Sequence, residues 1–305
     1  MNLMLIKKET KSYFKIASSA AKRWWKKDPF MQSSIIAYYA IFSIPGLLIM
    51  VISISTIFFQ EDVITSHLFN QISSMMGEET AKQVQGMIVS ISKADKSLLA
   101  TILGLIVVLV GATGVFVELQ KALNIIWEVK AKQRRAIFTL LRTRLFSFGL
   151  VVSIGFLLLI SLFITTMIAA LGEWVLIHLP DLMRIVFYVL NFVVAFGVVM
   201  LLFALMFKII PDAKILWKHI WPGSFLTAFL FMLGKYAIGY YLSKTNPGSA
   251  YGAAGSIVII LLWVSYSSMI LFYGAEFTRA YADHITGKVS AKDDAVNTTR
   301  LKNIK

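Results

Sequence analysis

Residues 98–117 read LLATILGLIVVLVGATGVFV, twenty consecutive residues without a charged side chain. A helix that crosses the hydrocarbon core of a bilayer needs about 20 mostly apolar residues, so this stretch has the length of one membrane span. Further stretches of the same kind occur along the chain. The six predicted spans are residues 35–58, 98–117, 145–171, 183–207, 222–242 and 252–274. The sequence therefore predicts an all-α integral membrane protein with six transmembrane helices.

The composition agrees with this fold class and excludes several others. Of the 305 residues, 58% are hydrophobic and 15% are charged, and the mean hydropathy is +0.74. A soluble domain has about 25% charged residues, so this chain has too few to cover a cytosolic enzyme or to stay disordered. Cysteine is absent, which excludes disulfides and thiolate metal sites, and the four histidines are dispersed. We expect no catalytic residue, no metal site and no cofactor.

Positive charge is distributed unevenly between the segments that connect the spans. The net charge is +14, and 24 of the 30 lysines and arginines lie in alternate segments that include the N-terminal one. The other connections hold 4. Because cytoplasmic loops of membrane proteins accumulate basic residues, both termini are predicted to be cytoplasmic. Topology accounts for most of the charge, the remainder favours anionic phospholipids as partners, and no nucleic-acid partner is expected.

The segments outside the spans are predicted to lie at the membrane surface or in water. Residues 1–34 form a basic amphipathic helix that lies in the plane of the interface with its apolar face in lipid. The residues of that face are Ile6, Tyr13, Ile16, Ala20 and Trp24. Residues 61–94 predict two short amphipathic helices on the outer side. Residues 35–280 are the predicted membrane domain, and residues 281–305 are a predicted polar cytoplasmic tail. The part of this tail after Gly287 is predicted to be disordered.

Several short motifs follow one another along the chain in a specific order. They are AYYAIFSIPG at 37–46, GATG at 111–114, ELQKALNIIW at 118–127, WPG at 221–223, YGAAG at 251–255 and GAE at 274–276. Together they resemble the YihY/BrkB family of bacterial inner-membrane proteins over about residues 25–280, although that family often has Pro-Pro where this chain has Pro45-Gly46. The resemblance implies a six-helix protein of the cytoplasmic membrane. Some members of the family carry a ribonuclease or virulence-factor label, and one branch is linked to export of lipid A precursors.

The ribonuclease label finds no support in the residues of this chain. Hydrolysis of RNA needs a metal cluster, a histidine pair or a comparable acid–base set. His67 and His178 fall in predicted outer segments, and Glu118, Glu128 and Asp212 do not have the spacing of paired carboxylates. We therefore expect no enzymatic activity.

Lys235 is the basic residue that lies deepest within a predicted span. An ionised lysine at the centre of a membrane helix costs about 2.5–3.5 kcal/mol, and no carboxylate is predicted at the same depth. Two interpretations stay open: the side chain snorkels to the outer headgroups, or it faces a wet cavity and holds an anionic group. Tyr240 follows on the same helix, where it suits a cavity wall or ordinary packing.

The first span supplies the other candidate substrate-binding residues. Tyr38, Tyr39 and Ser43 precede Pro45-Gly46, which is predicted to break the helix within the membrane. Discontinuous helices often line transport sites, because the freed carbonyls need protein or water as partners. The alternative is a proline kink that serves packing.

Polar residues gather at the predicted cytoplasmic ends of the spans and form a candidate gate. They are Glu118, Gln120, Asn124, Glu276 and Arg279. Glu276 and Arg279 are three residues apart and can pair on one helix face. These residues suit a gate of switchable ion pairs, and the alternative is a static collar of salt bridges.

These features predict a transporter or flippase for an anionic amphiphile such as a lipid or lipid precursor. Its support is the unpaired Lys235, the broken first span and the lipid-export branch of the resembling family. The alternative is a non-catalytic membrane scaffold that organises partners through its basic N-terminal helix. The predicted partners are membrane lipids, above all anionic phospholipids, and a homo-oligomer is kept as an alternative to a monomer.

Overall fold

The structure is a computed structural model that describes four long stretches of the chain. They are residues 3–55, 98–131, 181–245 and 255–286, with the short segments 65–66, 69–70, 73, 81–82, 85–86 and 295–297. The predicted span 145–171 and most of the predicted outer helices in 61–94 lie outside the described residues.

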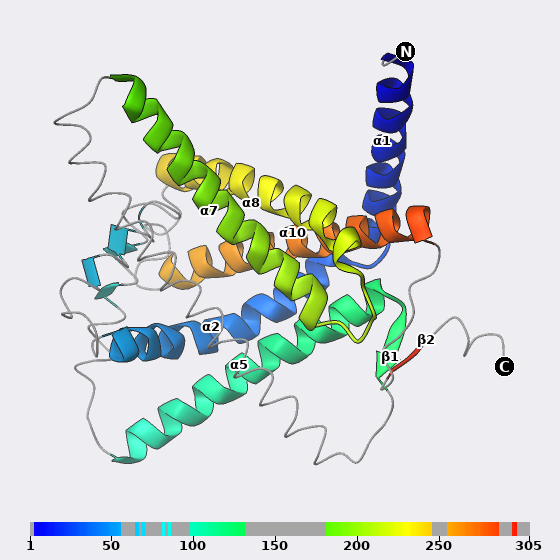
Figure 1. The fold of residues 1–305 in the computed structure, drawn as a ribbon. Coiled ribbons are helices and arrows are strands. Elements are labelled where there is room, and N and C mark those ends of the chain that lie inside the picture. The colour runs from blue at the N-terminus through cyan, green and yellow to red at the C-terminus, as the bar shows by residue number, and fades with distance from the viewer. Residues whose placement is uncertain are drawn as a thin grey trace.

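Long helices make up nearly all of the described chain (Figure 1). They are α1 (Leu3–Trp25), α2 (Pro29–Ser55), α5 (Leu98–Ile126), α7 (Asp181–Ile209), α8 (Trp217–Thr245) and α10 (Gly255–Thr286). Five of the six predicted spans thus coincide with helices, and the predicted N-terminal helix is α1. The helices are longer than the apolar stretches within them, because their polar ends continue the same backbone hydrogen bonding.

Within the part of the chain that the structure describes, two helices contain segments that are long and apolar enough to cross a membrane by composition. They are Phe192–Ile209 in α7 and Ile257–Ile285 in α10. Only 17% of the α7 window and 33% of the α10 window are buried, whereas the core helix of a soluble protein is mostly buried. At 1.5 Å per residue, α2, α5 and α8 are each about 40 Å long, which exceeds the thickness of the hydrocarbon core.

The predicted break in the first span is wrong at the level of the backbone. α2 runs as one continuous helix from Pro29 to Ser55 and includes Pro45 and Gly46. A proline inside a helix removes one N–H donor and crowds the carbonyl four residues earlier, but a membrane helix tolerates it where neighbouring groups satisfy the freed backbone. Pro29 occupies the first position of α2, where a proline suits a helix start.

α10 is the central helix of the described fold, since it contacts α1, α2, α5 and α8 (Figure 1). α2 packs along α5, and α7 packs along α8. The best-packed core lies at the end of the bundle where α5 and α7 finish and α8 begins. Its fully buried side chains include Leu123, Phe207, Ile210, Ile220 and Phe272.

The described part of the α1 face that the sequence assigns to lipid, from Ile16 to Trp24, packs against protein instead. Ile16 and Ala20 are buried against Phe277 and Ala280 of α10. Trp24 donates its indole N–H to the carbonyl of Met269 at 3.1 Å. Periodicity identified the residues that share this face, but α10 supplies the apolar surface that covers it.

The polar tail also contains regular structure. α10 continues to Thr286, and β2 (Ala295–Asn297) pairs antiparallel with β1 (Val129–Ala131), with Lys130 opposite Val296. The expectation of a disordered tail is therefore wrong for residues 295–297. This short ribbon ties the C-terminal segment to the end of α5.

α8 and α10 are joined by two matched contacts between glycine and threonine. A Cβ built on Gly223 lies 1.7 Å from Thr278 Oγ1, and one built on Gly274 lies 1.8 Å from Thr227 Oγ1. Each threonine hydroxyl donates to the glycine carbonyl four residues earlier on its own helix, at 2.6 Å and 2.7 Å. The absence of a side chain at both glycines therefore sets the close approach of these helices.

Candidate functional site

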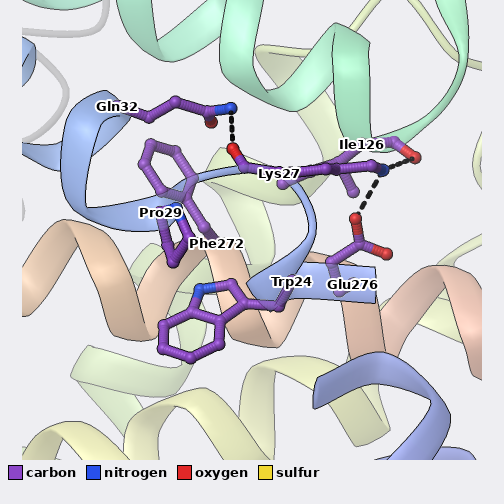
Figure 2. A pocket seen from close by; sticks show the side chains of 7 residues that line it. All are labelled: Trp24, Lys27, Pro29, Gln32, Ile126, Phe272 and Glu276. Atoms are coloured by element: carbon purple, nitrogen blue, oxygen red, sulfur yellow. Dashed lines mark hydrogen bonds and ion pairs between the residues drawn. The ribbon is translucent and has the colours of Figure 1, made fainter. Parts of the chain in front are cut away.

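Glu276 of α10 is a fully buried carboxylate at the end of the bundle where α1 meets α2. Lys27 Nζ lies 2.5 Å from Glu276 Oε1, and Arg23 Nε lies 3.4 Å from Oε2. Figure 2 shows the Lys27 side chain reaching across the turn between α1 and α2 towards Glu276. A buried charge is costly unless it is paired, and these two cations offset the cost of burying the Glu276 carboxylate.

The pairing continues outward as a chain of alternating charges, which we call the Glu276 hub. Its members are Arg23, Lys27, Glu128, Glu276, Arg279 and Asp283. Asp283 Oδ2 lies 3.5 Å from Arg23 Nη1 and 3.6 Å from Arg279 Nε, and Arg279 Nη2 lies 2.9 Å from Glu128 Oε2. Three acids thus face three bases, and the hub is neutral as a whole.

Two cations of the hub also hold the end of α5. Lys27 Nζ donates to the carbonyls of Ile125 and Ile126 at 3.3 Å and 3.4 Å, and the Arg279 guanidinium donates to Ile126 as well. The last carbonyls of a helix lack partners within it and carry partial negative charge, so cations are favourable there. The hub therefore joins α1, α2, α5 and α10 at one place.

The turns that meet at the hub have unusual backbone conformations. Asp28, between α1 and α2, has φ of 50°, and Glu128, just after α5, has φ of 52°. Residues with a side chain rarely adopt this left-handed region, and it persists where surrounding contacts hold it. Between these turns lies a narrow pocket, lined by Trp24, Lys27, Pro29, Gln32, Ile126, Phe272 and Glu276 (Figure 2).

The predicted gate residues divide between three places. Glu276 and Arg279 lie in the hub, but each pairs with residues from other elements. Glu118 forms an exposed pair with Lys121 on α5 at 2.7 Å. Arg23 and Lys27 were missed as hub members, because a basic N-terminal segment gives no sign of a partner about 250 positions away.

Gln120 and Asn124 hold the loop between α7 and α8. Asn124 Nδ2 donates to Asp212 Oδ2 at 2.8 Å, and Asn124 Oδ1 accepts from the Asp212 backbone N–H at 2.8 Å. Gln120 Nε2 donates to the carbonyl of Ile210 at 3.3 Å. This arrangement fixes the α7–α8 loop against α5.

The predicted substrate-binding residues lie on two different helices. Lys235 of α8 is half-buried, with Nζ 5.9 Å from the centre of the Tyr236 ring, and Tyr236 and Tyr240 are exposed. On α2, Ser43 is buried and donates to the carbonyl of Ala40 at 3.2 Å. Tyr39 packs against Gly114 of α5, and the exposed Tyr38 contacts Phe42. The contacts of the described residues do not join these two sets.

His219 predicts a pH dependence of stability at the start of α8. The side chain is buried, and burial together with the nearby Lys218 charge lowers its pKa below the ordinary 6.5. Below pH 6.5 the His219 imidazole is then protonated more fully in the unfolded chain than in the folded one. The free energy of unfolding therefore falls on acidification. Thermal unfolding in one detergent between pH 7.5 and pH 5.5 should show a smaller loss for His219→Gln than for the unsubstituted protein. Parallel pH curves for the two proteins would contradict this assignment.

No group of three histidine, cysteine, aspartate or glutamate side chains with the geometry of a metal site occurs among the residues that the structure describes.

Comparisons with known proteins identify relatives over most of the chain. The family profile described as "Virulence factor BrkB" matches residues 20–299. A "UPF0761 membrane protein" of Verminephrobacter eiseniae is 28% identical over 224 residues, which cover 72% of this chain and 50% of the relative. Another of the same name from Saccharophagus degradans is 27% identical over 262 residues, covering 86% of this chain and 58% of the relative. The chain thus spans about half the length of these curated relatives, and no solved structure matches it.

Proposed function

Because the chain belongs to the BrkB family and is similar to proteins named as membrane proteins, we propose that it is a transporter or flippase for an anionic amphiphile, such as a lipid or lipid precursor. In this proposal it is not an enzyme and carries no cofactor. The helical bundle, with largely unburied apolar helices such as α7, supports a place within a bilayer.

The proposed topology has six spans with both termini in the cytoplasm, in the cytoplasmic membrane. Two clusters of tryptophan with lysine support this orientation, one at the α1–α2 turn and one at the α7–α8 turn. Their exposed members are Lys22, Trp25, Lys26, Lys214, Trp217, Lys218 and Trp221. Both turns lie at the end of the bundle that holds the hub (Figure 1). Basic residues favour the cytoplasmic side and tryptophan favours the headgroup level, so this end is the inner one in our proposal.

Lys235 is the single observation that carries the proposal of an anionic substrate. It lies about 15 Å from the Thr245 end of α8 and about 27 Å from the Trp217 end, at 1.5 Å per residue. Its described contact is the face of Tyr236, not a carboxylate. A cation at this depth commonly marks a substrate or ion path, and an anionic headgroup would compensate its charge.

The hub and the Asp212 contacts are the proposed inner gate. They join the ends of α1, α2, α5 and α10 and the α7–α8 loop by polar contacts between discrete partners, and switching proteins often repack such contacts between two discrete arrangements. The alternative of a static collar predicts that no step of transport changes these pairs.

Native mass spectrometry tests the role of Lys235. The purified protein is expected to retain a defined anionic ligand that Lys235→Ala loses and Lys235→Arg keeps, because binding needs a cation at that depth. Lys244→Ala is the matched control, since Lys244 is exposed and also lies over a tyrosine ring, 6.0 Å from the centre of Tyr240.

The same experiment separates transport from the alternative function. If all four proteins carry the same mixture of lipids, Lys235 is a snorkelling anchor and the transport proposal fails. The basic α1 then favours a membrane scaffold.

A further inference from the structure

The outer face of α1 carries a second apolar strip, distinct from the one that packs against α10. Phe14, Ser18, Ala21 and Trp25 follow one another at spacings of four, three and four residues, so they share one line along the helix. Phe14 is 76% exposed and Trp25 is 64% exposed. Large apolar side chains in such a line on a helix of a membrane protein need a covering surface.

This strip continues across the turn into the start of α2. The Trp25 ring meets Phe30 edge-on, with centroids 5.8 Å apart. Phe30 and the adjacent Met31 are themselves exposed. The aromatic contact makes the two helix ends one continuous apolar surface.

Lysines border the strip on one side. Lys15, Lys22 and Lys26 are all exposed and are spaced seven and four residues apart, which places them along a single neighbouring line of α1. None of them belongs to the Glu276 hub, so their charges are available to an external partner. An apolar strip beside a basic line is the pattern of a helix that lies in the interface of an anionic membrane.

The orientation of this surface is fixed by the opposite side of α1. Ile16 and Ala20 are buried against α10, and Arg23 is held by Glu276 and Asp283. The contacts between α1 and α10 therefore determine which face of α1 is exposed, without any contribution from the membrane. A surface that is already ordered loses less conformational freedom when it binds.

We propose that the outer face of α1 and the first turn of α2 bind the anionic phospholipids of the adjoining leaflet. Phe14, Trp25, Phe30 and Met31 enter the boundary between headgroups and acyl chains, and the lysine line contacts phosphate groups. Charge complementarity selects this partner, since inner leaflets are anionic and attract basic residues near their surface. The surface is separate from the Lys235 site, so the proposal does not depend on transport.

Two adjacent serines provide a matched test. Ser18 lies on the apolar strip and Ser19 lies beyond the lysine line, and both are exposed. Because the chain has no cysteine, Ser18→Cys and Ser19→Cys each create one labelling site and leave every aromatic residue and lysine in place. The full chain with a nitroxide on either cysteine is reconstituted in nanodiscs of phosphatidylcholine, with and without phosphatidylglycerol. Oxygen and nickel-chelate accessibilities then report how deep each label lies.

We expect the Ser18 label to be more accessible to oxygen than to the nickel chelate, and the Ser19 label to show the reverse. Phosphatidylglycerol should raise the oxygen-to-nickel ratio at Ser18 several-fold. High salt, or Lys15→Gln, Lys22→Gln and Lys26→Gln together, should abolish that increase, since screening weakens surface electrostatics.

Three results would overturn the proposal. The first is equal exposure of the two labels to the nickel chelate in both lipid compositions. The second is a Ser18 label that lies at the same depth with and without phosphatidylglycerol. The third is protection of the Ser18 label by added single-stranded RNA and not by lipid. Unfolding curves of the triple lysine variant check that it is folded, and no change is expected because the three side chains are exposed.

Discussion

Lys27→Met is expected to destabilise the folded protein by about 3 kcal/mol, the lower end of the cost of leaving one partner of a buried ion pair alone. Glu276 is fully buried, and Lys27 is its closest cation at 2.5 Å. Arg23 stays 3.4 Å from the carboxylate and limits the loss. The same substitution removes the Lys27 hydrogen bonds to the carbonyls of Ile125 and Ile126, while Arg279 still donates to Ile126. Equilibrium unfolding in a single detergent measures the change.

Lys26→Met is the matched control for this prediction. Lys26 is the neighbouring residue, carries the same charge and is exposed, so its loss should change stability by less than about 0.5 kcal/mol. Adding Glu276→Gln to Lys27→Met should recover part of the loss, because the unpaired charge is then gone. Equal effects of the two lysine substitutions would show that Glu276 does not depend on Lys27.

Gly223→Ala is expected to cost about 3 kcal/mol or to prevent assembly of the bundle, since overpacking of this severity exceeds what side-chain shifts absorb. The new Cβ would lie 1.7 Å from Thr278 Oγ1, 2.8 Å from its Cβ and 3.2 Å from its Cα. The last of these is backbone, so relief requires α8 and α10 to separate. Thermal unfolding and the yield of monodisperse protein measure the effect.

Gly197→Ala on α7 is the control, because nothing lies within 4 Å of a Cβ at that position. Alanine is the better helix former by about 0.8–1.0 kcal/mol, so this variant should be neutral or more stable. Combining Gly223→Ala with Thr278→Ala removes the shortest contact but leaves the one at 2.8 Å, and rescue should be partial. If Gly223→Ala behaves as Gly197→Ala does, the close approach of α8 and α10 is not real.

Local patterns in the sequence predict where the helices lie along the chain, but not which helices pack against one another. Apolar stretches of span length and a proline at Pro29 are enough to place α2, α5, α7, α8 and α10. The same local reasoning failed at Pro45, because a proline inside a helix held by its neighbours does not end it. It also assigned Ile16 and Ala20 to lipid, because periodicity defines a face without saying what covers it.

The hub was harder to predict for a related reason. Glu276 and Arg279 stood out as polar groups at the end of an apolar helix, but Lys27 and Glu128 join them only through the packing of distant helices. The contact between α8 and α10 does correspond to a pattern in the sequence. A glycine precedes a threonine by four residues at Gly223 and again at Gly274. That repeated spacing was a signal the sequence reasoning passed over.

The two glycine–threonine contacts have a consequence for how the bundle can move. Sliding α8 along α10 by a single residue, or rotating either helix about its axis, would carry both threonines off the glycines and onto positions that have side chains. The two helices are thus locked in register and travel as one rigid body. If the hub opens as proposed, this body and the α2–α5 pair must tilt relative to each other, with α10's contacts to α2 and α5 as the sliding interface.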